Sequence, residues 1–287
     1  MRGNLVRLLL ILGLPHLPLV AWGAAAEVDR AAAAKAVFPE MDRLVEQRLG
    51  ENSIPGAVYG VVIDGQLAHA ATFGYRDVGQ RLEVTGDTIF RIASMSKSFT
   101  ALAVMLLRDD GALSLDDPVE LHVTEMQGMP LATRDSGPVT IRQLLTHTAG
   151  FPEDNPWGDR QLAVDHDEFS GWLAAGIPFS TAPGAAYEYS NTGFAILGRV
   201  VANVSGMQFA EFVQQRILDP LQMSSTFWDP EEVPRARLAT GYSLGGGHGG
   251  FAPGDPEGEL SIERPLDDGA YGSMGGHGSI AYSARVR

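Results

Sequence analysis

The feature that most constrains the fold is a short strand that runs directly into an amphipathic helix. Residues 88–92 have the β-branched and aromatic composition of a strand. Behind this segment, apolar residues recur at three- and four-residue steps, at Phe99, Leu102, Ala103, Leu106 and Leu107. This spacing predicts a helix with one buried face that continues to about Arg108.

Ser94 and Lys97 lie at this junction, three residues apart. On a helix, two such side chains share a face with their Cβ atoms about 5–6 Å apart, so the lysine amine can reach the serine hydroxyl. The free N–H groups and the positive dipole end of the first turn favour an oxyanion beside the serine. A serine hydroxyl still needs a base, and lysine serves only if burial or a cationic neighbour lowers its pKa. Because an S-x-x-K pair alone also fits a solvated helix face, a partner motif is required.

The N-terminal part predicts one helix followed by a β-hairpin. Helix-spaced apolar residues predict a helix over residues 36–49 that ends at Gly50. Residues 55–63 and 66–75 have the composition of strands, and they flank Asp64-Gly65, a two-residue turn signal that closes a hairpin.

Between Gly111 and Leu238 the pattern indicates helices and loops, and no strand is predicted. Helices are expected over residues 141–150, 167–175, 191–204 and 208–218. We therefore predict an α/β (α+β) fold with a helical region at residues 111–270. Residues 27–110 would form the N-terminal part of the α/β domain, and residues 271–287 would begin the return to it.

The first 26 residues resemble a signal peptide. Two arginines precede an apolar run at residues 8–20 that two prolines interrupt, and Ala24-Ala25-Ala26 offers a cleavage site. The run is too short and too broken for a membrane span. We therefore expect an exported protein, periplasmic or secreted. Removing these residues takes two arginines from a chain of net charge −14 and leaves −16.

Composition excludes several classes of function. So acidic a chain argues against a nucleic-acid partner. The absence of cysteine excludes disulfides, thiolate metal sites and a cysteine nucleophile. The glycine-rich segments after Gly241 lack the preceding strand and following helix of a nucleotide-binding motif. No metal and no cofactor is expected.

Tyr189 and Asn191 supply the candidate partner of Ser94. They follow the turn signal Pro183-Gly184 and immediately precede an apolar-periodic helix. A phenol beside a lysine can shuttle a proton, and an amide two residues later can hold Lys97 or the substrate's own amide. Taken alone, the same residues also fit a buried tyrosine and an asparagine N-cap.

Three segments together resemble the serine β-lactamase-related hydrolases: Ser94-Met95-Ser96-Lys97, residues 144–151 (LLTHTAGF) and residues 183–194 (PGAAYEYSNTGF). S-x-x-K is an established signature of β-lactamases and penicillin-binding proteins. The Tyr-x-Asn form looks like class C β-lactamases, D-alanyl-D-alanine carboxypeptidases and the esterases of that fold. The resemblance covers about residues 37–287. It implies a β-lactamase/transpeptidase-like fold, in which helices flank an antiparallel sheet and a further region is all helical.

The resemblance also assigns roles to the site residues. It makes Ser94 the nucleophile, Lys97 and Tyr189 the base system, and Asn191 a substrate-binding, positioning residue. Both Lys97 and Tyr189 stay candidates for the general base, because a coupled pair titrates as a unit. His147 lies in a matching segment but is not one of the family's catalytic groups, so we interpret it as structural.

The sequence departs from the family pattern in two places. Ser190 stands where class C β-lactamases usually carry alanine, a form more common among the related esterases and peptidases. The third motif, a Lys-Thr-Gly or His-x-Gly strand, falls beyond residue 287 in the family. His277-Gly278-Ser279 matches it loosely, but its setting looks like the family's earlier Gly-Gly-x-x-Ser-x-Ala loop before a helix.

We therefore expect a C-terminally truncated family member that lacks the remaining sheet strands and the second oxyanion donor, and is at most weakly active. The competing hypothesis is that residues 275–279 fold back as the third wall of the pocket.

Two other patterns are interpreted as structural. Residues 241–245 spell G-x-S-x-G, but a nucleophile elbow needs a following helix, and the glycine run at residues 245–250 cannot form one. Residues 165–168 (DHDE) could suggest a metal site. Consecutive helical side chains point in different directions, so an acidic helix N-terminus is favoured.

The predicted function is hydrolysis of a small-molecule ester, a β-lactam or a D-amino-acid amide through an acyl-Ser94 intermediate. The alternative is a secreted pseudoenzyme that holds a peptidoglycan-like peptide without turnover, which the missing third motif favours.

Overall fold

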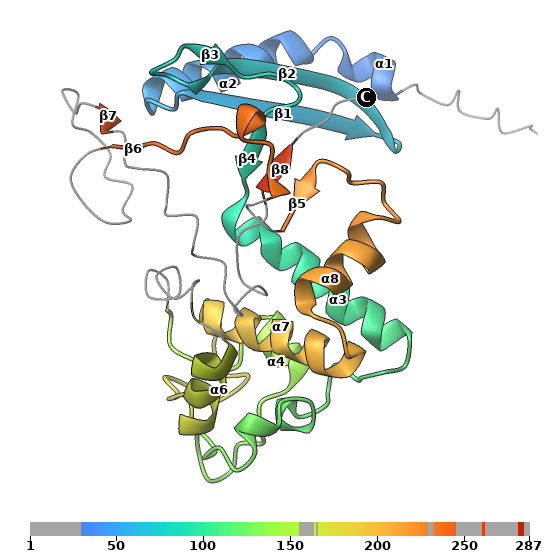
Figure 1. The fold of residues 1–287 in the computed structure, drawn as a ribbon, viewed down its shortest axis with the longest axis vertical. Helices are drawn as coiled ribbons and strands as arrows, with labels where there is room; N and C mark the ends of the chain where they lie inside the picture. The colour runs from blue at the N-terminus through green and yellow to red at the C-terminus, as the bar shows by residue number, and fades with distance from the viewer. Residues whose placement is uncertain are drawn as a thin grey trace, which may run out of the picture.

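A computed structural model of the chain describes residues 30–154, 164, 166–228, 232–244, 260–261 and 281–283. An antiparallel sheet lies at one end of the molecule and a group of helices at the other, and α3 (Lys97–Asp109) runs between them (Figure 1). The predicted signal peptide and the His277 segment lie outside the described residues. No helix of the described part has the length and apolar character needed to cross a membrane.

The predicted hairpin is confirmed. Strands β1 (Gly56–Ile63) and β2 (Gln66–Asp77) pair antiparallel, and β3 (Leu82–Glu83) adds to the far edge of β2. Asp64 and Gly65 have φ values of +51° and +76°, both positive as a type I′ turn requires. The predicted first helix is α2 (Phe38–Glu51), preceded by α1 (Arg30–Ala34).

Helix α2 is joined to the sheet by a small polar cluster. Asp42 accepts hydrogen bonds from the Tyr59 hydroxyl at 2.7 Å and from Nε2 of His69 at 2.8 Å. The ring of Phe38 stacks on His69 with centroids 4.5 Å apart. These contacts fix the helix across one face of the hairpin (Figure 1).

A second sheet corrects the prediction that residues 111–238 contain no strand. Its order is β4-β8-β5, with β4 at Ile89–Arg91, β5 at Thr226–Phe227 and β8 at Ala281–Ser283. Strand β5 lies inside the predicted helical block, and β8 lies where the resemblance implies a loop before a helix. Strands β5 and β8 are too short for an alternating pattern, so only tertiary pairing creates them. Strand β4, in contrast, lies within the strand predicted at residues 88–92.

Two residues of the G-x-S-x-G segment, Ser243 and Leu244, also form a strand. Ser243 lies in β6 (Ser243–Leu244) and is paired with Ser261 of β7 (Leu260–Ser261). A nucleophile elbow would instead place the serine on a sharp turn between a strand and a helix.

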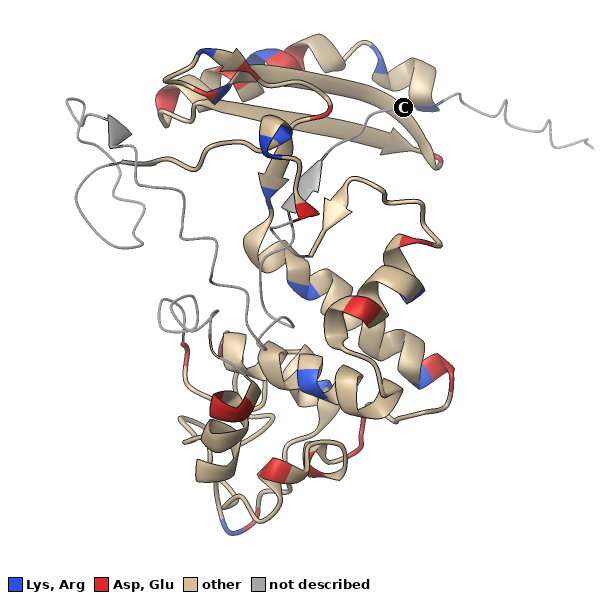
Figure 2. Cartoon of the chain, viewed as in Figure 1, with Lys and Arg blue, Asp and Glu red and all other residues tan. Residues whose placement is uncertain are grey.

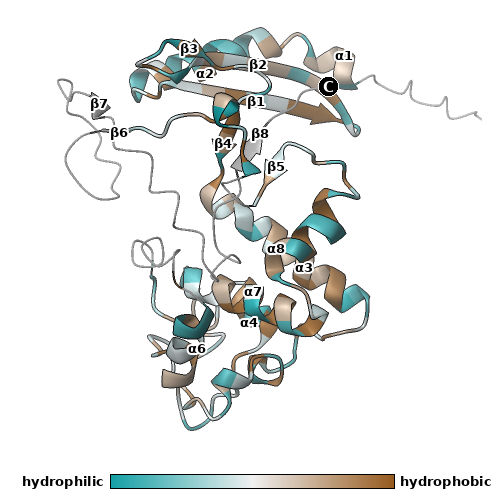
Figure 3. Cartoon of the chain, viewed as in Figure 1, coloured by the Kyte–Doolittle hydropathy of each residue, from teal (hydrophilic) through white to brown (hydrophobic). Residues whose placement is uncertain are grey.

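The main hydrophobic core lies among the helices. It is built by α3 with α4 (Ile141–Leu145), α6 (His166–Ala175), α7 (Asn191–Ser205) and α8 (Phe209–Val213), along which Figure 3 shows the apolar segments. Helix α7 is buried nearly all round from Gly193 to Val201, as expected of a helix that is apolar on every side. Its left-handed C-cap is Gly206, which confirms the predicted end.

The other predicted helices differ in length from the expectation. Helix α4 ends at Leu145 and not at Gly150, because Thr146 and the residues after it turn away. Helix α8 continues as a π-helical turn at Gln214–Leu218. Asp167 and Glu168 occupy the first turn of α6, as the predicted acidic helix N-terminus requires.

Charged residues of both signs are spread along the elements of the described chain (Figure 2), and one ion pair in the helical region has a buried arginine and a partly buried glutamate. Arg199 of α7 donates to Glu125 of the 3₁₀ helix η3 (Thr124–Met126) at 2.6 Å. Ser170 of α6 donates to the same carboxylate at 3.1 Å. Three elements are therefore joined through Glu125.

We expect Glu125→Ala to lower the free energy of unfolding by about 3 kcal/mol, because it leaves the buried Arg199 guanidinium without its counter-charge. Urea denaturation of the purified chain measures this loss. Glu40→Ala is the matched control, since Glu40 pairs with Arg43 on the exposed face of α2 and should cost less than about 1 kcal/mol. Equal losses in the two variants would show that water reaches Arg199.

Candidate active site

Ser94 is placed by a sharp turn between β4 and α3. Its neighbour Ala93 has φ of +43°, which is unusual for a residue other than glycine. A short 3₁₀ helix, η1 (Ala93–Ser96), follows and continues into α3. In a 3₁₀ turn the side chains at i and i+3 eclipse, so Ser94 and Lys97 come closer than an α-helix alone would bring them.

The structure brings all four predicted site residues together. The Oγ atom of Ser94 receives hydrogen bonds from Lys97 Nζ at 3.1 Å and from the Tyr189 hydroxyl at 2.7 Å. Lys97 Nζ also donates to Asn191 Oδ1 at 2.7 Å. Ser94 is exposed, whereas Lys97 is only 7% exposed and Asn191 is fully buried. An accessible hydroxyl with two proton-carrying neighbours suits nucleophilic catalysis.

The aromatic surroundings of Lys97 fix the direction of its amine. Nζ lies 4.9 Å from the ring centroid of Tyr189 and 5.7 Å from that of Phe194, within range of cation–π attraction. Asn191 holds the amine from one side and Ser94 from the other. The amine is therefore aimed at the serine oxygen.

The backbone N–H of Ser94 is the candidate oxyanion donor. It lies in the first turn of η1, where N–H groups have no acceptor within the helix. Such a group can donate to the negative oxygen that forms when a serine attacks a carbonyl.

Asp154 is a site residue that the sequence did not reveal. Its Oδ1 accepts the N–H of Asn191 and its Oδ2 the N–H of Thr192, both at 2.7 Å. The Ser190 hydroxyl is the N-cap of α7 and accepts the N–H of Gly193 at 3.0 Å. The cap is therefore Ser190 and not Asn191, which frees the Asn191 side chain for Lys97.

His147, for which the sequence predicts only a structural role, also contacts the Tyr189 segment. Its Nδ1 accepts the N–H of Ser190 at 3.0 Å, and its ring centroid lies 4.6 Å from that of Tyr189. Burial and the Lys97 charge lower the pKa of His147, and the carboxylate of Asp154 opposes them weakly. The ring is therefore neutral at pH 7.

Among the described residues, no three His, Asp or Glu side chains converge. These residues therefore offer no candidate ligand set for a metal ion. Asp165, the first member of the acidic cluster considered above, lies outside the described residues.

Comparison with known proteins identifies the family. Residues 41–285 match the profile of the family described as Beta-lactamase. The chain belongs to this family. It is 30% identical over 218 residues to Protein flp of Staphylococcus aureus strain MW2, covering 72% of this chain and 41% of that protein. It is also 31% identical over 167 residues to Penicillin-binding protein 4* of Bacillus subtilis, covering 56% of this chain and 35% of that protein.

Solved structures agree with this membership. An octameric penicillin-binding protein homologue from Pyrococcus abyssi aligns with a TM-score of 0.70 and 32% identity, over 86% of this chain and 54% of that one. EstCE1, a hydrolase with promiscuous acyltransferase activity, aligns with a TM-score of 0.70 and 26% identity, over 89% of this chain and 71% of that one. The β-lactamase/transpeptidase-like fold is therefore confirmed. The chain spans about two fifths of the length of the first curated relative.

Proposed function

We propose that this chain is a serine hydrolase that transfers the acyl group of an ester, a β-lactam or a D-amino-acid amide to Ser94 and then to water. The observation that carries the proposal is the arrangement at Ser94 Oγ, which Lys97 and Tyr189 both contact within 3.1 Å. The relatives support the hydrolase class, because a penicillin-binding protein homologue and a hydrolase with acyltransferase activity share this fold.

In the proposed acylation, the deprotonated member of the Lys97–Tyr189 pair takes the Ser94 proton while Oγ bonds to the substrate's carbonyl carbon. The carbonyl oxygen becomes an oxyanion that accepts the N–H of Ser94. When the carbonyl re-forms, the bond to the leaving oxygen or nitrogen breaks, and the leaving group takes the proton from the pair.

In deacylation, water is the attacking group and Ser94 Oγ is the leaving group. The same pair takes one proton from a water molecule, whose oxygen bonds to the acyl carbon, and returns the proton to Ser94 Oγ as the acyl–serine bond breaks. Asn191 stabilises the pair in both halves by holding Lys97 Nζ. We propose that this reaction takes place outside the cytoplasm, which is supported by the signal-like pattern of residues 1–26.

We expect penicillin and a fluorophosphonate probe to form covalent adducts on Ser94, because both acylate or phosphylate an activated serine. Intact-protein and peptide mass spectrometry of the full chain measures the adduct. The penicillin adduct should decay with time, while the fluorophosphonate adduct should persist. Reversible binding without any adduct would contradict the proposal and support the pseudoenzyme that holds peptidoglycan-like peptides.

A chromogenic cephalosporin, a p-nitrophenyl ester and a D-alanyl-D-alanine peptide then rank the three acyl donors. Each assay uses the same enzyme preparation, and initial rates over a concentration series give kcat/KM for each compound. The ratios identify the acyl donor, since discrimination is a ratio of kcat/KM values.

A further inference from the structure

We propose that His147, in its neutral form with the proton on Nε2, is a positioning residue that holds Tyr189 against Ser94, and that protonation of its ring ends this hold. The inference rests on the proposed role of Tyr189 in the base system. It assigns a function to a histidine that the reaction itself does not use.

His147 bonds to both chain neighbours of Tyr189. Its carbonyl oxygen accepts the N–H of Glu188 at 2.8 Å, and its Nδ1 accepts the N–H of Ser190 at 3.0 Å. The backbone on each side of Tyr189 is therefore fixed to a single residue. A shift of His147 would move the Tyr189 hydroxyl relative to Ser94 Oγ, which it now contacts at 2.7 Å.

The ring of His147 also packs between the aromatic side chains of the site. Its centroid lies 4.6 Å from that of Tyr189 and 4.9 Å from that of Phe194. Lys97 Nζ lies near these same two rings. The imidazole thus limits the position of the Tyr189 ring as well as that of its backbone.

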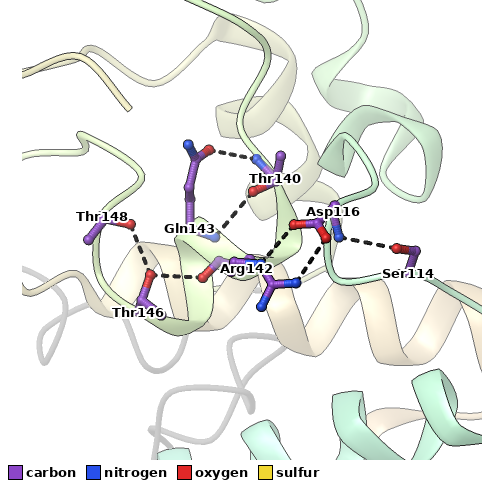
Figure 4. Close-up of polar contacts among 7 residues, drawn as sticks. All are labelled: Ser114, Asp116, Thr140, Arg142, Gln143, Thr146 and Thr148. Carbon is purple, nitrogen blue, oxygen red and sulfur yellow. Dashed lines mark hydrogen bonds and ion pairs between the residues drawn. The ribbon is translucent and has the colours of Figure 1, made fainter. Parts of the chain in front are cut away.

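The backbone at His147 is held in an uncommon conformation. Its φ of +54° lies in the left-handed region, which costs energy for any residue other than glycine. Figure 4 shows the polar contacts of its two chain neighbours: Thr146 Oγ1 donates to the carbonyl of Arg142 at 2.9 Å and lies 2.9 Å from Thr148 Oγ1.

The beginning of α4 is fixed in the same way. Thr140 and Gln143 form a capping box, and Arg142 pairs with Asp116 at 2.7 Å (Figure 4). Because both ends of α4 are anchored, His147 keeps its strained positive φ. This conformation directs its carbonyl oxygen and its ring to residues 188–190.

The Ser190 bond defines the protonation state of His147. An N–H donor requires an unprotonated Nδ1, so the ring carries its proton on Nε2. In imidazolium both nitrogens carry protons, and Nδ1–H would then face the N–H of Ser190. Protonation therefore replaces an attraction with a repulsion at the residue next to Tyr189.

The charged groups around the ring set the pH at which this occurs. Burial of the ring is the largest cause that lowers the pKa of His147, the charge of Lys97 in α3 lowers it further, and the carboxylate of Asp154 raises it. Tyr187 lies 5.5 Å from the ring, and the carboxylate of Glu188 accepts a hydrogen bond from Ser180. The net effect lowers the pKa of His147 below its usual 6.5. The bond from Ser190 N–H to His147 Nδ1 is thus fully formed at neutral pH, and it is lost as the pH falls through the lowered pKa of His147.

Two substitutions test the proposal. His147→Asn keeps an oxygen acceptor near the position of Nδ1, tolerates positive φ and cannot be protonated in this pH range. We expect it to retain kcat/KM within about threefold at pH 7.5 and to lack the activity decrease that we expect of the parent below pH 6.5. His147→Ala removes the acceptor and should lower kcat by about 10–100-fold with KM nearly unchanged.

His69→Asn is the matched control, because His69 contacts Asp42 in the cluster between α2 and the hairpin and lies outside this site. It should leave the pH profile of kcat/KM unchanged. An acid limb in His147→Asn that equals that of the parent would assign the titration to another group and would overturn the proposal.

A spectroscopic readout separates this inference from the proposed function. Ring ¹⁵N chemical shifts of the full chain, assigned with His147→Asn, report the tautomer of His147 whether or not the protein turns over a substrate. We expect the Nε2–H tautomer at pH 7.5 and its protonation below pH 6.5. A protonated Nδ1 at pH 7.5 would overturn the inference even in an active enzyme. A chain with the expected tautomer but no adduct on Ser94 would refute the proposed function alone.

Discussion

Ser94→Ala is expected to lower kcat/KM by about 10⁴-fold or more for the ester, β-lactam or amide of the proposed reaction, and to abolish covalent labelling. The substitution removes the atom to which the acyl group would bond. The contacts from Lys97 and Tyr189 converge on this same atom, so no other described hydroxyl can replace it in the same geometry. Because Ser94 is exposed, water can take over these contacts and Tm should stay nearly constant.

Ser98→Ala provides the matched control for this experiment. Ser98 lies one turn along from Ser94 at the start of α3 and is exposed. The change is chemically the same and improves helix propensity slightly. It should leave both kcat/KM and labelling unchanged. Residual turnover of Ser94→Ala at the parent rate would mean that the reaction uses another nucleophile.

The elements that the sequence predicted well are those with strong local signals. Asp64-Gly65 determines the hairpin because only a few residue pairs accept two successive positive φ values. Helix α7 combines a polar N-cap, an apolar run and a glycine at its end. Ser94, Lys97, Tyr189 and Asn191 could be selected because two short motifs, each with its own chemistry, begin or precede a predicted helix.

The features that escaped prediction depend on contacts between distant residues. Strands β5 and β8 pair across more than fifty residues and have no pattern of their own. Asp154 lies 37 residues before Asn191, and no local motif indicates that its carboxylate accepts the N–H groups of α7. His147 stands within a matching segment, but its role follows from the Ser190 contact 43 residues away. Within the described part of the chain, both residues bond to backbone N–H groups beside Tyr189 and not to Ser94 Oγ, so the two motifs alone do not select them.

Lys97→Met should lower kcat by about 10³-fold, within the usual range for loss of an acid–base group. Methionine preserves the unbranched shape of the side chain among the Tyr189 and Phe194 rings. The change removes a buried charge, which offsets the loss of the bond to Asn191. We therefore expect Tm to fall by no more than about 4 °C. Turnover at the parent rate would show that Lys97 takes no part in the reaction.

Lys97→Arg then separates charge from proton transfer. A guanidinium keeps the positive charge beside Tyr189 but does not give up its proton in proteins. If Lys97 accepts the proton of Ser94, this variant should lose as much activity as Lys97→Met. If Tyr189 accepts it and Lys97 only stabilises the phenolate, the arginine variant should keep kcat within about tenfold of the parent while Lys97→Met does not. Comparing kcat for the two variants on the best of the three substrates, with Tm measured for each, therefore assigns the general base between Lys97 and Tyr189.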